Sequence, residues 1–309
     1  MISSSFSAHP SARLLCRVVA CLLAGLGVTT TVAAPIPLGQ SSRKVAVANE
    51  VIEVHAYKPV GYHGGPLLVS FHGLSRNVER YLGAAKPVAE RHGMVLVMPL
   101  FDRTRFPYWR YQGLGITRQS RGVTSGPIPV EPPETWTSVL ITGLIDELRR
   151  LEGNPGLEYY LVGHSAGGQI VNRMAAFGTD AARQFVVANP SSFVAPARTA
   201  RFPYGFGELP QAMSNDAALR RYLARPLTIL AGTDDVLDDS LDKRPAAMAQ
   251  GATRYERARN VFDMAQSLAR ARGWAFNWRF VEVRDVGHDV GAMYGGNEID
   301  IALFGTHYQ

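Results

Sequence analysis

The sequence of 309 residues contains only two cysteines, Cys16 and Cys21, and both lie within its first 33 residues. Without that segment the chain has no thiol, which excludes disulfide bonds, a cysteine nucleophile and cysteine metal ligands. It also lacks the closely spaced histidines of a zinc site and a glycine-rich phosphate loop after a strand, so no metal and no cofactor is expected. The chemistry is therefore expected to come from hydroxyls, carboxylates and imidazoles.

The first 33 residues have the pattern of an export signal. Arg13 and Arg17 precede an apolar run over residues 18–28, and the small residues Thr31-Val32-Ala33 suit cleavage after Ala33. The run is shorter than the roughly 20 apolar residues that a membrane span needs, so no stable span is expected after cleavage. An uncleaved N-terminal anchor is the alternative. We predict a protein exported to the periplasm or secreted.

The charge surplus is small. The formal net charge is +6 and falls to +4 without residues 1–33, because that segment contains two arginines and no acidic residue. No basic run with interleaved aromatic residues forms a stripe, so nucleic acid is not an expected partner. With 46% hydrophobic and 19% charged residues, residues 34–309 are expected to form one globular domain.

Patterns typical of strands and helices alternate along this domain. The apolar runs 67–71 and 94–98 flank a helical pattern that begins at Asn77, and this order predicts a parallel sheet. Residues 51–57 alternate as an edge strand does. Further strands are expected at 157–162, 185–188, 227–231 and 278–283, and further helices at 135–151, 170–177, 255–272 and up to about residue 304.

Two stretches lack this periodicity. Residues 99–133 are rich in aromatic side chains and arginines, and among them Trp109, Arg110 and Tyr111 are candidate substrate contacts for an aromatic or carboxylate-bearing group. A solvated, partly ordered loop is the alternative, and the usual exposure of arginine favours it. Residues 190–226 contain several helix breakers and are predicted to form a small cap over the site.

The segment Gly163-His164-Ser165-Ala166-Gly167 lies between an expected strand and an expected helix. A serine on such a tight turn projects its hydroxyl away from the sheet, and side chains at Gly163 and Gly167 would clash. The following helix N-terminus presents backbone N–H groups to an oxyanion. Ser165 is therefore the predicted nucleophile, and the N–H group of Ala166 is a predicted oxyanion donor.

A serine nucleophile needs a base and an orienting carboxylate, which in an open parallel sheet lie at the carboxyl ends of later strands. In the chain order serine, acid, histidine, the base lies beyond the acid, and only His288 and His307 follow the candidate acids after strand 227–231. His307 is two residues from the C-terminus, where fraying is expected, so His288 is the predicted base. The acid is expected after strand 227–231. The spacing from Gly232 favours Asp235, with Asp234 as the alternative.

The second oxyanion donor is expected in His72-Gly73-Leu74, directly after strand 67–71. A glycine allows a sharp turn there, so the donor is assigned to the N–H group of Leu74, with Gly73 as the alternative. The side chain of His72 either faces a ligand or bonds to the loop backbone.

Together, His72-Gly73, Gly163–Gly167, Gly232–Asp235 and Gly287-His288 resemble the α/β-hydrolase superfamily, from about residue 45 to the end. Within it, the chain resembles the secreted serine esterases grouped with polyhydroxybutyrate depolymerases and feruloyl esterases. The resemblance implies an α/β-hydrolase fold: a mostly parallel, twisted sheet with helices on both faces and a small cap. It also implies hydrolysis of a small-molecule or polymeric carboxylic ester through an acyl-Ser165 intermediate. A serine peptidase, an acyltransferase and a noncatalytic binding protein on the same fold are the alternatives.

Overall fold

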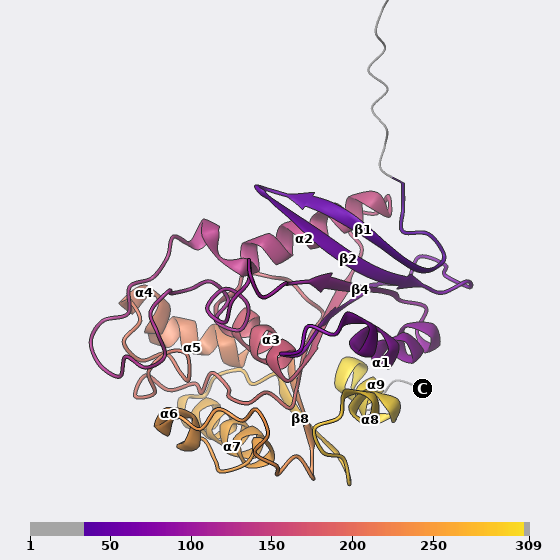
Figure 1. Ribbon diagram of the computed structural model, residues 1–309. Helices are drawn as coiled ribbons and strands as arrows, with labels where there is room; N and C mark the ends of the chain where they lie inside the picture. Colours follow the sequence, from indigo (N-terminus) through magenta and orange to yellow (C-terminus); the bar gives the residue numbers. More distant parts are fainter. Residues whose placement is uncertain (1–33, 306–309) are drawn as a thin grey trace, which may run out of the picture. The chain divides into compact units, whose positions relative to one another are not determined.

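The structure, a computed structural model, describes residues 34–305 (Figure 1). The predicted export signal, residues 1–33, and the candidate base His307 lie outside the described residues. Within residues 34–305, none of the helices is long and apolar enough to span a membrane.

One sheet with the strand order β1-β2-β4-β3-β5-β6-β7-β8 forms the centre of the described chain (Figure 1). Its strands are β1 (Gly39–Val47), β2 (Glu50–Lys58), β3 (Leu67–Phe71), β4 (Val95–Leu100), β5 (Tyr159–His164), β6 (Gln184–Ala188), β7 (Leu227–Gly232) and β8 (Trp278–Val283). The pairs β1–β2 and β2–β4 are antiparallel, and all the others are parallel. The prediction of a mostly parallel sheet is confirmed.

The edge of the sheet differs from the prediction. Residues 51–57 were expected to form an edge strand, but β2 pairs with β4 on one side and with β1 on the other. In β1 only Val45 and Val47 are buried, near its end, and the preceding residues are polar and partly exposed. The hydrophobic alternation that would identify a strand is therefore too short in β1 for sequence analysis to recognise.

Helices cover both faces of the sheet. One face carries α1 (Val78–Arg91), α8 (Val290–Gly295) and α9 (Glu298–Phe304). The other carries α2 (Thr137–Leu151), α3 (Ala166–Phe177), α5 (Asp216–Leu223) and α7 (Arg254–Arg272). The remaining helices are the short η1 (Pro133–Thr135), α4 (Gln211–Ser214) and α6 (Pro245–Met248). The predicted helices on both faces are confirmed.

The central strands are apolar throughout because they have two covered faces. In β3, Leu67 and Val69 contact the core on the α2 and α3 side, whereas Leu68 between them contacts the core on the α1 side. In β5, Leu161 contacts the core on the α2 and α3 side and Val162 contacts the core on the α1 side. Successive side chains of a strand point to opposite faces, so a strand buried on both sides reads as a continuous apolar run.

Capping residues fix where two of the helices begin. The side chain of Asn77 accepts a hydrogen bond from the N–H group of Arg80, which confirms the predicted start of α1. Thr253 and Glu256 form a capping box at the start of α7, and Gly273 ends that helix in the left-handed region, with φ of 62°. The capping box places Arg254 in the first turn of α7.

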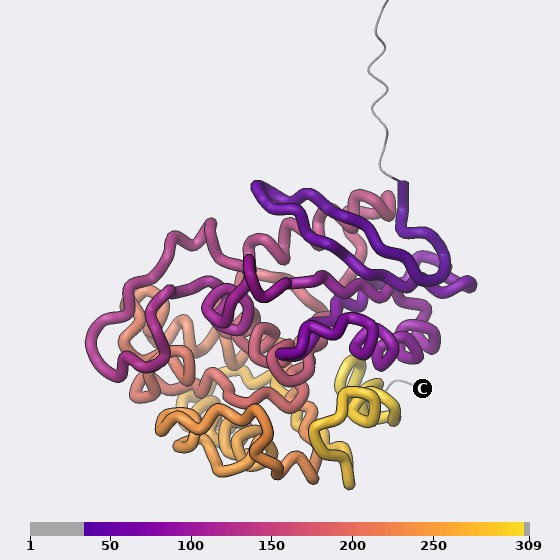
Figure 2. Tube along the Cα trace, in the orientation of Figure 1, coloured from indigo at the N-terminus to yellow at the C-terminus, as the bar shows by residue number. Residues whose placement is uncertain are grey.

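The two stretches without periodicity are ordered and packed. Phe101, Phe106 and Tyr111 are fully buried, so the alternative of a solvated loop at residues 99–133 is wrong for its aromatic part. In the 190–226 segment Phe193 and Phe206 are fully buried and α5 packs on α3, so much of that segment belongs to the helical layer. Figure 2 shows the two segments side by side, and both line one pocket. That residues 190–226 act as a cap stays a prediction.

Candidate active site

Ser165 lies on the tight turn between β5 and α3, with φ of 60° and ψ of −120°, and its N–H group donates to the carbonyl of Ala188 at 2.9 Å. Glycine is required on both sides of it. A Cβ atom on Gly163 would lie 2.1 Å from the carbonyl oxygen of Gly167, and a Cβ on Gly167 would lie 2.0 Å from that of Phe71. The clashes predicted from the sequence are therefore confirmed, and the turn brings the end of β3 against the start of α3.

His288 lies between Ser165 and Asp235. Its Nε2 atom is 3.0 Å from Ser165 Oγ, and its Nδ1 atom is 2.7 Å from Asp235 Oδ2. A carboxylate at Nδ1 accepts a proton from that nitrogen, which leaves the Nε2 lone pair directed at the serine hydroxyl. Asp235 is 1% exposed, whereas the exposed Asp234 accepts a hydrogen bond from Thr233. Of the two candidate acids, the structure brings Asp235 to His288.

Arg254 binds the other oxygen of Asp235. Its Nη1 atom donates to Asp235 Oδ1 at 3.2 Å and to the carbonyl of Leu237 at 3.1 Å, and Nη2 donates to the carbonyl of Asp239. The side chains of Arg254 and Asp235 are both buried, so each compensates the charge of the other. Sequence analysis missed this residue, because only the packing of α7 against the end of β7 brings it to the acid.

His164 packs against His288, with ring centres 4.5 Å apart. Its Nδ1 atom is 3.4 Å from the hydroxyl of Tyr81. Burial, the largest cause, and the neighbouring His288 hold the pKa of His164 well below its usual range. The imidazole of His164 is therefore neutral, and it adds no positive charge next to His288.

The predicted oxyanion donors lie on two elements that meet at Ser165. Ala166 is the first residue of α3, and Leu74 follows β3, whose end contacts Gly167. Gly73 allows the loop to approach α1 closely, because a Cβ atom there would lie 1.9 Å from the hydroxyl of Tyr81. The roles of Leu74, or Gly73, and Ala166 as oxyanion donors stay predictions.

Two of the candidate substrate contacts are structural. His72 is fully buried, its Nε2 accepts from the N–H group of Phe101 at 3.1 Å, and its Nδ1 is 3.2 Å from the carbonyl of Gly73. Burial lowers the pKa of His72 to about 3, so the ring is neutral. Tyr111 is also fully buried and donates to the carbonyl of His72 at 2.6 Å. The prediction that these side chains face a ligand is wrong. The alternative for His72, bonding to the loop backbone, is confirmed.

The other two candidates lie closer to the surface. Arg110 pairs with Glu50 at 2.8 Å and stacks on Phe106, so its charge is already compensated. Trp109 lines a pocket, and the guanidinium of Arg118 lies 4.7 Å from its ring centre. Contact of Trp109 or Arg110 with a substrate stays a prediction.

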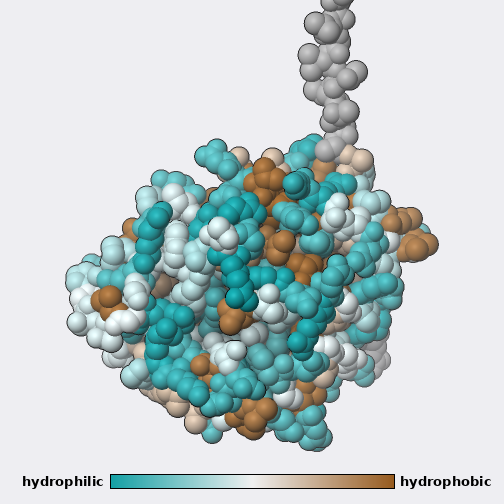
Figure 3. Space-filling view, in the orientation of Figure 1, coloured by the Kyte–Doolittle hydropathy of each residue, from teal (hydrophilic) through white to brown (hydrophobic). Residues whose placement is uncertain are grey.

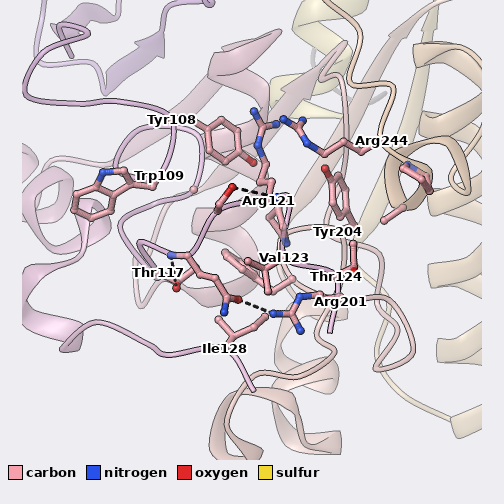
Figure 4. A pocket seen from close by; sticks show the side chains of 18 residues that line it. Tyr108, Trp109, Thr117, Arg121, Val123, Thr124, Ile128, Arg201, Tyr204 and Arg244 are labelled. Carbon is pink, nitrogen blue, oxygen red and sulfur yellow. Dashed lines mark hydrogen bonds between the residues drawn. The ribbon is translucent and has the colours of Figure 1, made fainter. Parts of the chain in front are cut away.

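Two cavities lie side by side near this site. The first, which we call the arginine cleft, has a volume of about 400 Å³ and is lined by Leu74, Arg76, Arg103, Pro107, Tyr108, Gln112, Arg121, Ser191, Ser240, Leu241, Asp242 and Arg244. The second, which we call the apolar pocket, has a volume of about 390 Å³. Tyr108, Arg121 and Arg244 line both cavities, and Figure 4 shows the apolar pocket bounded by these residues together with Trp109, Ile128 and Tyr204.

Hydrogen bonds connect the arginine cleft to the nucleophile. Gln169, in the first turn of α3, accepts from Gln112 at 2.8 Å and donates to Ser191 at 2.9 Å. Its N–H group donates to the carbonyl of Ser165 at 3.1 Å. Leu74, which carries a predicted oxyanion donor, also lines the cleft. Gln112 and Ser191 therefore tie one wall of the arginine cleft to the first turn of α3, the turn that follows Ser165.

Exposed apolar side chains stand on the loops that carry this site. Leu74 follows β3, and Val236 and Leu237 follow Asp235; all three are exposed. On the face of the molecule shown in Figure 3, hydrophobic residues form separate groups among hydrophilic ones. Within residues 34–305, no group of three or more His, Cys, Asp or Glu side chains is placed to bind a metal ion.

The fold and the Ser165–His288–Asp235 arrangement define the class as an α/β hydrolase. No family model and no curated protein sequence matches the chain. Among solved structures, a poly(3-hydroxybutyrate) depolymerase, LpqC, from Bordetella parapertussis is similar, with 31% identity, a TM-score of 0.75 and coverage of 85% of this chain and 89% of that one. Poly(aspartic acid) hydrolase-1 from Sphingomonas sp. KT-1 has 26% identity, a TM-score of 0.76 and coverage of 85% and 98%. A thermophilic esterase from Thermogutta terrifontis, at 13% identity and a TM-score of 0.51 over 88% of this chain and 97% of that one, shares the fold.

The chain belongs to the α/β-hydrolase serine esterases of the polyhydroxybutyrate depolymerase-like group, and it is a hydrolase. The family resemblance drawn from the four motifs is confirmed.

Proposed function

We propose that the protein hydrolyses carboxylic esters through a covalent acyl-Ser165 intermediate. The observation that carries the proposal is the continuous contact from Ser165 Oγ through the His288 ring to Asp235, at 3.0 and 2.7 Å. The name of the Bordetella structure, a depolymerase of a polyester, supports an ester as the substrate.

The geometry supports the following steps. Ser165 Oγ attacks the ester carbonyl carbon while His288 Nε2 takes the hydroxyl proton, and Asp235 keeps the Nδ1–H group directed toward itself. The N–H groups of Ala166 and Leu74 stabilise the oxyanion of the tetrahedral intermediate. When that intermediate collapses, the alcohol leaves with the proton from His288. Water then loses a proton to His288 and attacks the acyl-enzyme, which releases the carboxylic acid and restores Ser165.

Replacement of the nucleophile tests this proposal. We expect Ser165→Ala to lower kcat for short 4-nitrophenyl esters by roughly 10⁴-fold or more, and to abolish labelling by a fluorophosphonate, because no other group can form the acyl-enzyme. Ser42→Ala, on the exposed side of β1, is the matched control and should keep both. A Ser165→Ala protein that hydrolyses these esters at the parent rate would contradict the proposal.

Amide hydrolysis is the second candidate. It is favoured by the name of the Sphingomonas structure, a hydrolase of poly(aspartic acid), whose chain units are joined by amides. The same steps cleave an amide, with His288 protonating the leaving nitrogen. Rates for an ester and an amide with the same acyl group distinguish the two, and we expect the ester to be cleaved faster.

We also propose that the protein is exported and that residues 1–33 are removed. The residues that follow the predicted cleavage position pack against the domain: Ile36 is 2% exposed, and its N–H group donates to Glu152 at 2.9 Å. Arg43 donates to the carbonyls of Ala34 and Pro35, at 2.8 and 3.0 Å. A mature chain that starts at residue 34 would keep these contacts at its N-terminus.

A further inference from the structure

Four arginines line the arginine cleft, and they divide into two pairs. Arg121 and Arg244 form ion pairs with Asp242, at 2.9 and 2.8 Å. Arg76 and Arg103 form no ion pair with any residue in the described range 34–305. Two of the four guanidinium groups of the cleft therefore have no carboxylate of the described residues in ion-pair contact.

The unpaired arginines lie at the loop with the predicted oxyanion donor. Arg103 Nη2 donates to the carbonyl of Leu74 at 2.9 Å. Arg76 donates to the carbonyls of Gly73 and Phe106, at 3.4 and 3.2 Å, and its guanidinium lies 4.2 Å from the centre of the Tyr111 ring. A guanidinium has five N–H donors, so each arginine keeps free donors for a ligand.

Three nearby arginines outside the cleft are each paired with a carboxylate. Arg105 pairs with Asp102 at 2.6 Å, Arg110 with Glu50 at 2.8 Å and Arg118 with Glu131 at 3.1 Å. Arg76 is half-buried, and its Nε atom is buried without a hydrogen-bond partner within the described residues. Such a charge is costly to leave uncompensated, and a guanidinium is the side chain best suited to bind a carboxylate in two places.

We propose that Arg76 and Arg103 bind a free carboxylate of the substrate, and that the preferred substrates are esters with such a carboxylate a few bonds from the scissile carbonyl. The inference rests on the proposed ester hydrolysis at Ser165. It selects monoesters of dicarboxylic acids and the acidic ends of hydroxy-acid oligomers over neutral esters of the same size.

Matched pairs of acidic and capped esters test the proposal. Monoethyl glutarate carries the carboxylate on its acyl part, and diethyl glutarate is its neutral partner. The linear dimer of 3-hydroxybutyrate carries the carboxylate on its alcohol part, and its methyl ester is the neutral partner. Hydrolysis is followed by titration of the released acid at constant pH, for the parent protein and for Arg76→Gln, Arg103→Gln and the control Arg183→Gln. Arg183 is exposed, lies outside the cleft and pairs with Glu158.

For the parent protein we expect a KM at least tenfold lower for one or both acidic esters than for the capped partner. Arg103→Gln and Arg76→Gln should each raise that KM roughly 10-fold or more while changing the KM of the capped ester less than twofold, because a charged hydrogen bond is lost only with the acid. Added salt should raise KM for the acidic ester alone. Arg183→Gln should change neither value.

Equal effects of the substitutions on acidic and capped esters would overturn the inference, because the arginines would then only position the Leu74 loop. Equal KM values for the two esters in the parent would overturn it as well. Should Arg76→Gln fail to fold, Arg103→Gln, at an exposed position, still decides the question. Hydrolysis of neither ester, together with no fluorophosphonate labelling of Ser165, would instead contradict the proposed function.

Discussion

At the scale of single residues, His72 shows how burial decides between two roles that the sequence leaves open. Its ring accepts from the N–H group of Phe101 and bonds to the carbonyl of Gly73, so it joins the loop after β3 to the loop after β4. Only a neutral imidazole can accept and donate in this way. The same residue is therefore unavailable for a substrate and sensitive to acid.

The pKa of His72, lowered from 6.5 to about 3 by burial, predicts a loss of stability in acid. Between these values the unfolded chain binds a proton that the folded protein does not, so the stabilisation present above pH 6.5 is lost as the pH falls. The loss is about 3 kcal/mol near pH 4.5. We expect His72→Gln, which can still donate and accept, to reduce the difference in free energy of unfolding between pH 7 and 4.5 by about that amount, as measured by urea titration.

The exposed His63 gives the control for this experiment, because His63→Gln should leave the pH dependence as it is in the parent. A His72→Gln protein with the parent's full loss of stability in acid would show that His72 is not the responsible group.

At the scale of elements, the site is built from the ends of parallel strands. Ser165 follows β5, Asp235 follows β7 and His288 follows β8, and the sheet brings these three ends to one edge. A helix adds the fourth member: α7 begins at Arg254, whose guanidinium binds Asp235 and two carbonyls of the loop that follows it. Arg254 thus connects the start of α7 to the loop that follows β7 by hydrogen bonds.

We expect Arg254→Gln to lower kcat for a neutral ester roughly 10- to 100-fold with little change in KM, because Asp235 and the loop after it lose the group that fixes their position. Removal of one partner of a buried ion pair also costs about 3–5 kcal/mol, so kcat is measured on protein shown to be folded by its thermal unfolding curve. Arg254→Lys should recover part of the activity.

The control on the same helix is Arg259→Gln, since Arg259 is partly exposed and pairs with Glu282. If kcat of folded Arg254→Gln equals that of the parent, Arg254 supports only the stability of the loop.

At the scale of the whole molecule, the arginine cleft and the apolar pocket are formed by segments far apart in the chain. The apolar pocket is lined by Trp109 and Ile128 from one irregular segment and by Phe202 and Tyr204 from the other (Figure 4). Ion pairs also join the cavity walls, as between Arg121 and Asp242. The loops therefore depend on each other for their conformation, and the scaffold beneath them fixes only where they start and end.

The prediction of export can be tested by determining the N-terminal residue of the mature protein. When the full sequence is expressed in an exporting bacterial host, we expect mass spectrometry of the exported protein to show a chain that begins at Ala34, because Thr31-Val32-Ala33 suits signal peptidase. Ala33→Arg should block this cleavage. Recovery of the uncleaved parent chain from the membrane fraction would show that residues 1–33 act as an anchor.

The sequence by itself predicted the central strands and the long helices in order, Ser165 and His288 as nucleophile and base, and Asp235 or Asp234 as the acid. Central strands buried on both faces are continuous apolar runs, and glycines are required wherever backbones approach as closely as at Gly163 and Gly167. Such local constraints can be read from the residue types alone. Strand β1 was not predicted, because too few of its residues are buried to produce a hydrophobic alternation in the sequence.

Only the tertiary structure decided which neighbours each polar side chain meets. His72 and Tyr111 were expected to face a substrate, yet both are fully buried and hydrogen-bonded to the backbone of the loops after β3 and β4. Arg254 reaches Asp235 from a helix, and Arg76 and Arg103 remain without a carboxylate partner among the described residues while Arg105 and Arg110 have one. Charge compensation and burial depend on contacts between distant segments, and a sequence pattern reports only the contacts made within its own element.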